Sequence, residues 1–269
     1  MWALVKVMGP DFPHAEVAFF RALLAMPLML LLMWRSRQRL RPGHPTLMLA
    51  RGVLGGGAML AMFFALPRGK LAEFTIIGKT QPLMIAILSP LLIHERPPAT
   101  VLLSLALGFT GAVLVIKPGF GLINVASLMV LGAAFLSALA HLAVRRLNAT
   151  DPPLLIVFYF TVVVGVMCGL LSIPVFVAPS LQQWGLLLVL AQLAAGGQLL
   201  MTTAYGRDSA PVVAAAAYAS VVFALLLGHV FWHELPDGLA LIGGALVVGA
   251  GILLAWARRG IRQPPAPPD

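Results

Sequence analysis

The segment Leu71–Arg96, LAEFTIIGKTQPLMIAILSPLLIHER, contains an apolar run long enough to cross a bilayer, with a polar interruption near its middle. About 22 residues at 1.5 Å per residue match the thickness of the hydrocarbon core. The interruption is Lys79-Thr80-Gln81-Pro82, and the run ends in His94-Glu95. The same ending, His233-Glu234, follows another apolar run 139 residues later. A membrane segment that is polar at its centre and duplicated elsewhere is typical of a transport pathway.

The composition of the whole chain indicates that its solvent is lipid. Of 269 residues, 60% are hydrophobic and only 10% are charged, more apolar surface than a soluble domain can bury. The net charge of +9 does not indicate nucleic-acid binding, because the charges lie between apolar runs and no basic patch carries interleaved aromatic residues. The single cysteine, Cys168, excludes an intramolecular disulfide and a thiolate metal cluster, and we expect no cofactor.

The apolar runs predict an all-α, polytopic membrane protein with nine full transmembrane helices. Each run is about 17 to 24 residues long and is bounded by proline, glycine or charge. Met1–Met8 is apolar but too short to span, and we interpret it as the stub of a tenth helix. The predicted spans are Ala15–Trp34, Thr46–Leu66, Ala72–Ile93, Thr100–Ile116, Leu122–Val144, Pro153–Phe176, Trp184–Tyr205, Pro211–Trp232 and Gly238–Trp256.

The loop charges predict the orientation. The loop RSRQRLRPGH, residues 35–44, is rich in arginine, and alternation of the spans puts the C-terminal arginines on the same side. Since positive loops face the cytoplasm, we expect a multi-pass protein of a bacterial cytoplasmic (inner) membrane, surrounded by lipids, with its C-terminus cytoplasmic. Residues 259–269 are rich in proline and are expected to form a disordered cytoplasmic tail. Nothing in the sequence decides the oligomeric state, and a homodimer is left open.

The chain divides into two similar halves, residues 1–118 and 119–258. Each His-Glu pair is followed by a proline and then by a helix with a glycine late in its length, Gly111 in one half and Gly251 in the other. Five helices per half is an odd number, so the second half must enter the membrane upside down, as two inverted five-helix repeats. The alternative is that two helix ends look alike by chance.

Two cations inside predicted helices indicate a binding site for an anion. Lys79 and Arg21 both lie roughly 9 to 11 Å below the same surface, where they would repel each other unless they face water or an anionic group. The alternative is that each side chain extends to the headgroups. Tyr218 aligns with Lys79 when the halves are superimposed on their glutamates. With Gln81 beside it, this pair forms the predicted walls of one central site.

Uncharged polar residues in the second half could complete that site. Gln198, Thr202 and Tyr205 fall at positions i, i+4 and i+7 and therefore form one stripe on a helix. Such a stripe could hydrogen-bond a substrate, or it could merely bond a neighbouring helix.

Glu73 is a weaker candidate, for proton coupling. A carboxyl group partly buried near lipid can exchange a proton in the working pH range. The alternative is an interfacial group that pairs with Arg68 or Lys70.

No pattern for catalysis or metal binding is found. His229 and His233 lie at i and i+4 beside Glu234, but an interfacial role explains all three, and we predict no metal site. The sequence contains no nucleophile elbow, Walker loop or HExxH motif, so no catalytic residue is assigned and the protein is not expected to be an enzyme.

The chain resembles the EamA-type branch of the drug/metabolite transporter superfamily from about Trp2 to Ala257. The resemblance rests on VAFFRALLAMPLML, LAEFTIIGKTQPLMIAILSPLLIHE, RRLNATDPPLLIVFYF and AYASVVFALLLGHVFWHELPD, in that order and spacing. It implies ten helices in two inverted repeats, a substrate cavity between them and no covalent chemistry. The most similar branch includes proposed uptake carriers for S-adenosylmethionine and riboflavin. Three departures are a mostly missing first helix, histidine in place of glycine before Glu95 and Glu234, and Lys79 where small or apolar residues are commoner.

The sequence therefore predicts a secondary transporter that moves a small organic metabolite, with an anionic group, by alternating access around a midplane site. The alternatives are an intramembrane enzyme, which would need a catalytic dyad at one depth, and a non-transporting scaffold, for which the missing first helix argues. The substrate, the direction of transport and the coupling ion are left open.

Overall fold

A computed structural model of the chain describes residues 14–38, 40–65, 71–116, 125–232 and 237–260. Every regular element in these ranges is helical, and nine spans among them are long and apolar enough to cross a membrane. The prediction of an all-α polytopic protein with nine full spans is confirmed. The predicted N-terminal stub, most of the predicted tail, and the His233-Glu234 ending lie outside the described residues.

The helices begin and end close to the predicted positions, with two differences. The fourth and ninth helices of the predicted ten are each divided in two, and the helix from Leu181 to Arg207 is longer than predicted because Ser180 and Gln183 form a capping box at its start. The elements are α2 His14–Arg35, α3 Pro45–Ala65, α4 Leu71–Gly78, α5 Gln81–Leu92, α6 Ala99–Ile116, α7 Val125–Leu147, α8 Pro153–Ser172, η2 Ile173–Val175, α9 Leu181–Arg207, α10 Ala210–Ala216, α11 Ala219–Trp232 and α12 Gly238–Gly260.

The two breaks have the same local hydrogen bonding. At the first, the Thr80 hydroxyl donates to the Ile77 carbonyl at 2.5 Å, and at the second the Ser220 hydroxyl donates to the Ala217 carbonyl at 2.6 Å. A hydroxyl that bonds a carbonyl three residues back competes with the helical pattern. Pro82 reinforces the first break because it has no N–H to donate. The second break has no such proline and could not be predicted from the sequence.

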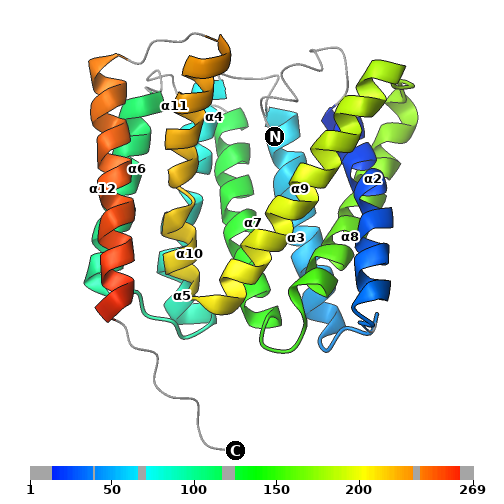
Figure 1. The fold of residues 1–269 in the computed structure, drawn as a ribbon, viewed down its shortest axis with the longest axis horizontal. Coiled ribbons are helices and arrows are strands. Elements are labelled where there is room, and N and C mark those ends of the chain that lie inside the picture. The colour runs from blue at the N-terminus through cyan, green and yellow to red at the C-terminus, as the bar shows by residue number, and fades with distance from the viewer. Residues whose placement is uncertain (1–13, 39, 66–70, 117–124, 233–236, 261–269) are drawn as a thin grey trace, which may run out of the picture.

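Three pairs of helices begin at the same separation along the chain, whereas α3 at 45 and α9 at 181 begin 136 residues apart. Helix α2 begins at residue 14 and α8 at 153; α4 begins at 71 and α10 at 210; α6 begins at 99 and α12 at 238, so each pair is 139 residues apart. The two members of each pair run in opposite directions (Figure 1). The loops that follow α2, α5, α7 and α9, together with the end of α12, all lie at the lower side of Figure 1, which we name the C-terminal face.

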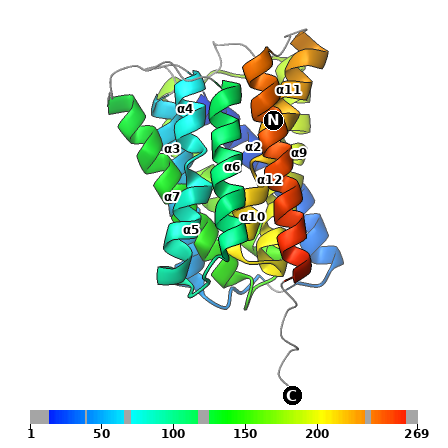
Figure 2. The same cartoon turned by 90° about the vertical axis from the view of Figure 1, so that its left-hand side faces the viewer.

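Glycine allows the closest helix contacts. Helices α6 and α12 lie side by side (Figure 2), and a Cβ placed on Gly111 would be 2.6 Å from the carbonyl oxygen of Gly243, with the reverse distance also 2.6 Å. Gly52 and Gly56 bring α3 close to side chains of α8 in the same way. These glycines are helix-packing positions, as small residues in membranes usually are. Gly251, aligned with Gly111 by sequence, faces open space.

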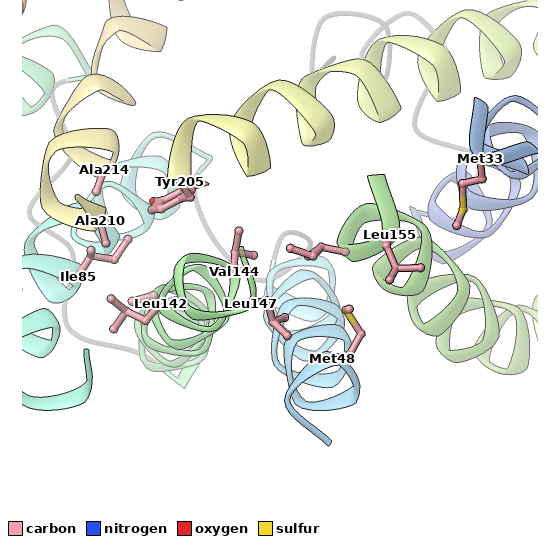
Figure 3. Packing of buried hydrophobic residues seen from close by; sticks show 12 residues of the cluster. Met33, Met48, Ile85, Leu142, Val144, Leu147, Leu155, Tyr205, Ala210 and Ala214 are labelled. Atoms are coloured by element: carbon pink, nitrogen blue, oxygen red, sulfur yellow. The ribbon is translucent and has the colours of Figure 1, made fainter. Parts of the chain in front are cut away.

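A cluster of buried apolar residues packs together in the part of the protein toward the C-terminal face, and we name it the apolar plug (Figure 3). Four of its members lie near helix ends: Met33 at the end of α2, Met48 at the start of α3, Leu147 at the end of α7 and Leu155 at the start of α8. The other members are Ile85, Ala138, Leu142, Val144, Ile156, Tyr205, Ala210 and Ala214. Seven helices contribute to this cluster: α2, α3, α5, α7, α8, α9 and α10.

Candidate substrate-binding site

The two broken helices cross and bond to each other at their breaks. The Tyr218 hydroxyl, on the second, donates to the backbone carbonyl of Lys79 on the first at 2.9 Å. The Lys79 ammonium in turn donates to the Ser220 hydroxyl at 2.6 Å. Lys79 and Tyr218 were predicted to face each other across a site, and they are in direct contact. Each backbone break is thus covered by a polar side chain of the other half, as irregular backbone at membrane depth requires.

Gln81 belongs to a second polar cluster, centred on His141 of α7. The Gln81 amide nitrogen lies 2.9 Å from His141 Nδ1, and the Ser137 carbonyl lies 2.6 Å from the same atom. The Tyr205 ring packs on the imidazole with centroids 5.3 Å apart, and Met201 Sδ lies 3.0 Å from Nε2. His141 lies one turn before Arg145 and Arg146, yet its ring is held between Gln81 of α5 and Met201 of α9.

Arg21 and Gln198 line one small cavity between α2, α8 and α9, of about 20 Å³, the size of a single water. The Arg21 guanidinium also donates to Met59 Sδ at 3.3 Å. The Gln198 carbonyl oxygen is buried and has no hydrogen-bond partner among the described residues, and the same is true of the Thr202 hydroxyl. Two members of the predicted polar stripe therefore hold unused hydrogen-bonding capacity.

Arg51 was missed as a site residue. It follows the arginine-rich loop of residues 35–44, but it lies in the second turn of α3 and is only 3% exposed. Its guanidinium carbon lies 4.0 Å from the centroid of the Phe160 ring. It is also close enough to Tyr205 and His141 to interact with them electrostatically. The available signal was its position six residues past Pro45, roughly 9 Å along the helix and too deep for a loop charge.

Glu95 joins the two halves at the C-terminal face. One carboxylate oxygen accepts from Arg145 Nε at 2.6 Å, and the other accepts from the backbone N–H of Ala210, the first residue of α10, at 2.7 Å. Arg145 also donates to the Tyr205 carbonyl at 3.0 Å. Glu95, which follows α5 in the first half, therefore caps the start of α10 in the second half. A depression of about 440 Å³ on this face is lined by Glu95, Arg145 and their neighbours.

The predicted residues form three groups instead of one. Lys79 and Tyr218 lie at the crossing, Gln81 and Tyr205 lie around His141, and Arg21 and Gln198 lie at the small cavity. Within the described residues, no hydrogen bond joins Arg21 to Lys79. The side chain of Glu73 lies outside what the structure describes. Among the described residues, no group of three histidine, cysteine or acidic side chains could hold a metal ion.

Tyr218→Phe is expected to destabilise the protein by about 1 kcal/mol, because it leaves the Lys79 carbonyl without its donor. The ring itself, 2% exposed, keeps its packing. The measurement is the melting temperature of the purified protein in detergent, beside Tyr159→Phe, which removes another hydroxyl-to-carbonyl bond, at Leu40, away from the crossing. A prediction failure would be a Tyr218→Phe variant that melts at the wild-type temperature. In a separate flux assay, a Tyr218→Phe variant with the wild-type rate would mean that this bond has no part in transport.

Comparison with known proteins identifies similar sequences over nearly the whole chain. The model of the EamA-like transporter family matches residues 1–117 and 124–256. The pseudopaline exporter of Pseudomonas aeruginosa is 35% identical over 97% of this chain and 92% of its own length. The riboflavin transporter of Brucella anthropi is 25% identical over 90% and 88%. A solved crystal structure shares the fold with a TM-score of 0.82, at 21% identity, over 97% of this chain and 93% of that one.

Proposed function

Since this chain belongs to the EamA-like transporter family, a family of small-molecule transporters, we propose that it is a secondary transporter working by alternating access in a bacterial cytoplasmic membrane. The similarity to the pseudopaline exporter favours a small organic metabolite as substrate and export as the direction. No catalytic role is proposed, because the family and the relatives are transporters.

The observation that carries this proposal is the crossing of two broken helices at equivalent positions. Lys79 and Tyr218 are 139 residues apart, the same spacing that separates the starts of α2 and α8. We therefore propose that residues 1–118 and 119–258 are two inverted five-helix repeats. In transporters built this way, the substrate binds beside the breaks, and the repeats rock against each other around that site.

The distribution of charge supports an orientation. Arg96, Arg145, Arg146 and Arg207 all lie at or near the C-terminal face. By the positive-inside rule this face is cytoplasmic. We propose that the apolar plug and the Glu95 bonds hold this face closed in an outward-facing state.

We propose that the substrate binds among the three polar groups described above. Lys79 would meet an anionic part of the substrate, while Gln81, Tyr205 and Tyr218 would supply hydrogen bonds or stacking. Arg21, Gln198 and Thr202 would form the far wall of this site. The unpartnered Gln198 and Thr202 oxygens support this role, because buried polar groups without a partner are uncommon in a closed structure.

Lys79→Ala is expected to reduce saturable flux at least tenfold while the protein remains folded, because the change removes an intramembrane cation. The measurement is flux of labelled pseudopaline, riboflavin and a panel of other metabolites in reconstituted vesicles. Ser220→Ala is the matched control, since it removes the bonding partner of Lys79 but keeps the ammonium.

If Ser220→Ala lost as much flux as Lys79→Ala, the lysine would have only a structural role. No flux of any tested metabolite by the wild-type chain would instead favour a non-transporting scaffold. An imposed pH gradient, applied to the wild type and to Glu73→Gln, tests the proposal that Glu73 couples transport to protons.

A further inference from the structure

Arg51 is a buried cation without a counter-charge. It makes no ion pair and no hydrogen bond with the part of the chain that the structure describes, and its Nε is buried and unpartnered. The buried acids of that part are bonded elsewhere: Glu16 accepts from the Val177 N–H at 2.8 Å, and Asp151 from the Gly43 N–H at 2.7 Å. A charge held inside a membrane protein in this way marks a functional site.

The Arg51 guanidinium lies in a slot formed by Phe160 and Gly55. The guanidinium carbon faces the Phe160 ring, and the NH1 end of the group points at Gly55 in the next turn of α3. A Cβ on Gly55 would clash first with NH1 and would lie 2.9 Å from the Phe160 ring, so the glycine gives both groups their room. With NH1 directed at Gly55, the edge that carries the unpartnered Nε is what remains for a ligand. A planar carboxylate fits such an edge, since it can accept two parallel N–H bonds.

The surroundings of Arg51 suit one end of an organic molecule. The charge of Arg51 interacts electrostatically with His141 of α7 and Tyr205 of α9, and Phe160 adds an aromatic surface. Met48 of the apolar plug is about one turn nearer the C-terminal face than Arg51 along α3.

We propose that Arg51 forms a carboxylate subsite for the transported molecule, which gives that molecule at least one acid group recognised by a guanidinium. The inference rests on the proposed transport function and deepens it, by assigning the anionic group to Arg51 in addition to Lys79. In the absence of substrate the cation is uncompensated, and the substrate carboxylate supplies the missing charge.

The first test is binding to the purified full-length chain in nanodiscs. The probes are acetate, succinate, glutamate and citrate, each against its neutral amide at constant ionic strength, with the shift in melting temperature as readout. We expect at least one carboxylate to stabilise the wild type, its amide to have no effect, and Arg51→Met to weaken the apparent affinity at least tenfold. Equal stabilisation of wild type and Arg51→Met, or of neither by any probe, would overturn the proposal.

Two glycine variants test the position of the guanidinium without removing its charge. Gly55→Ala places a methyl group on the guanidinium and is expected to weaken carboxylate binding about as much as Arg51→Met. Gly57→Ala is the matched control, because its Cβ would make only an ordinary 3.8 Å contact with Leu136. Carboxylate binding that survived Gly55→Ala would show that the slot is not the subsite.

The stability of the ligand-free protein separates a binding role from a structural one. If the role of Arg51 is to bind a ligand, Arg51→Met leaves the melting temperature of the ligand-free protein unchanged or raises it, because an uncompensated buried charge is removed. If Arg51 instead holds α3 to Phe160, the same variant melts at a lower temperature, and the proposal fails. Neither readout depends on flux, so a failure here is distinct from a failure of the transport function.

Discussion

Replacing Gly111 by valine is expected to prevent the chain from reaching its native fold. At this position the backbones of α6 and α12 are in contact, and the added side chain would meet the Gly243 carbonyl, which cannot rotate away. Overpacking against backbone costs about 3 kcal/mol or more, which is a large part of the stability of a typical protein. The measurement is the yield of monodisperse protein extracted in mild detergent, followed by its melting temperature.

Gly251→Val is the control for this prediction. It introduces the same residue into α12, the helix that packs against Gly111, but at a glycine with nothing within 4 Å of its Cβ position. The intrinsic effect of valine on a helix is therefore the same in both variants, and only the close contact differs. If Gly111→Val were as stable as Gly251→Val, helices α6 and α12 would not pack as closely as described.

Neutralising Glu95 is expected to open the C-terminal face. Glu95→Gln weakens two short, charge-assisted hydrogen bonds, to Arg145 and to the start of α10, each contributing about 1.5–3 kcal/mol. Loss of one such contribution shifts the closed population by roughly 10- to 100-fold. The measurement is the labelling rate of Met48→Cys, in a Cys168→Ser background, by a membrane-impermeant maleimide applied to this face.

Asp151→Asn provides the matched comparison for Glu95→Gln. Asp151 is another carboxylate near the same face, but it accepts from the Gly43 N–H and the Thr150 hydroxyl, so it bonds within the region of α2, α3, α7 and α8 and does not cap α10. Its neutralisation should leave the labelling of Met48→Cys close to the wild-type rate. Equal acceleration by both variants would mean that loss of any negative charge loosens the face, and that Glu95 is not a specific latch.

Much of the fold could be predicted because lipid imposes simple rules. Apolar runs bounded by charge or proline locate the nine spans. The two His-Glu pairs, each after an apolar run, predict that the chain contains two repeats. Pro82 marks the first break, since a missing N–H has a local effect that can be read from one residue. The second break depends on Ser220 and on contacts with Lys79, and such contacts between distant segments leave no local signal.

The site was harder to predict because the depth of a residue does not reveal the direction of its side chain. Lys79 and Arg21 were placed at similar depths, but they lie on helices that contact different partners. Arg51 follows an arginine-rich loop and His141 precedes two arginines, yet Arg51 is buried against Phe160 and His141 contacts Gln81. Rotation about a helix axis is fixed by tertiary packing, which one sequence does not display.

The contact between Lys79 and Tyr218 also bears on how such a protein could arise. If the two halves descend from one gene whose product paired with itself, symmetry would have placed each residue of the axis opposite its own copy. A lysine would then have met a lysine, and a tyrosine would have met a tyrosine. Only after fusion into a single polypeptide could the two copies diverge. One copy could then become lysine, and the other could acquire the Tyr218 hydroxyl that bonds the Lys79 carbonyl and the Ser220 hydroxyl that accepts from the ammonium. On that hypothesis, the contact between Lys79 and Tyr218 arose after the two halves were joined in one polypeptide.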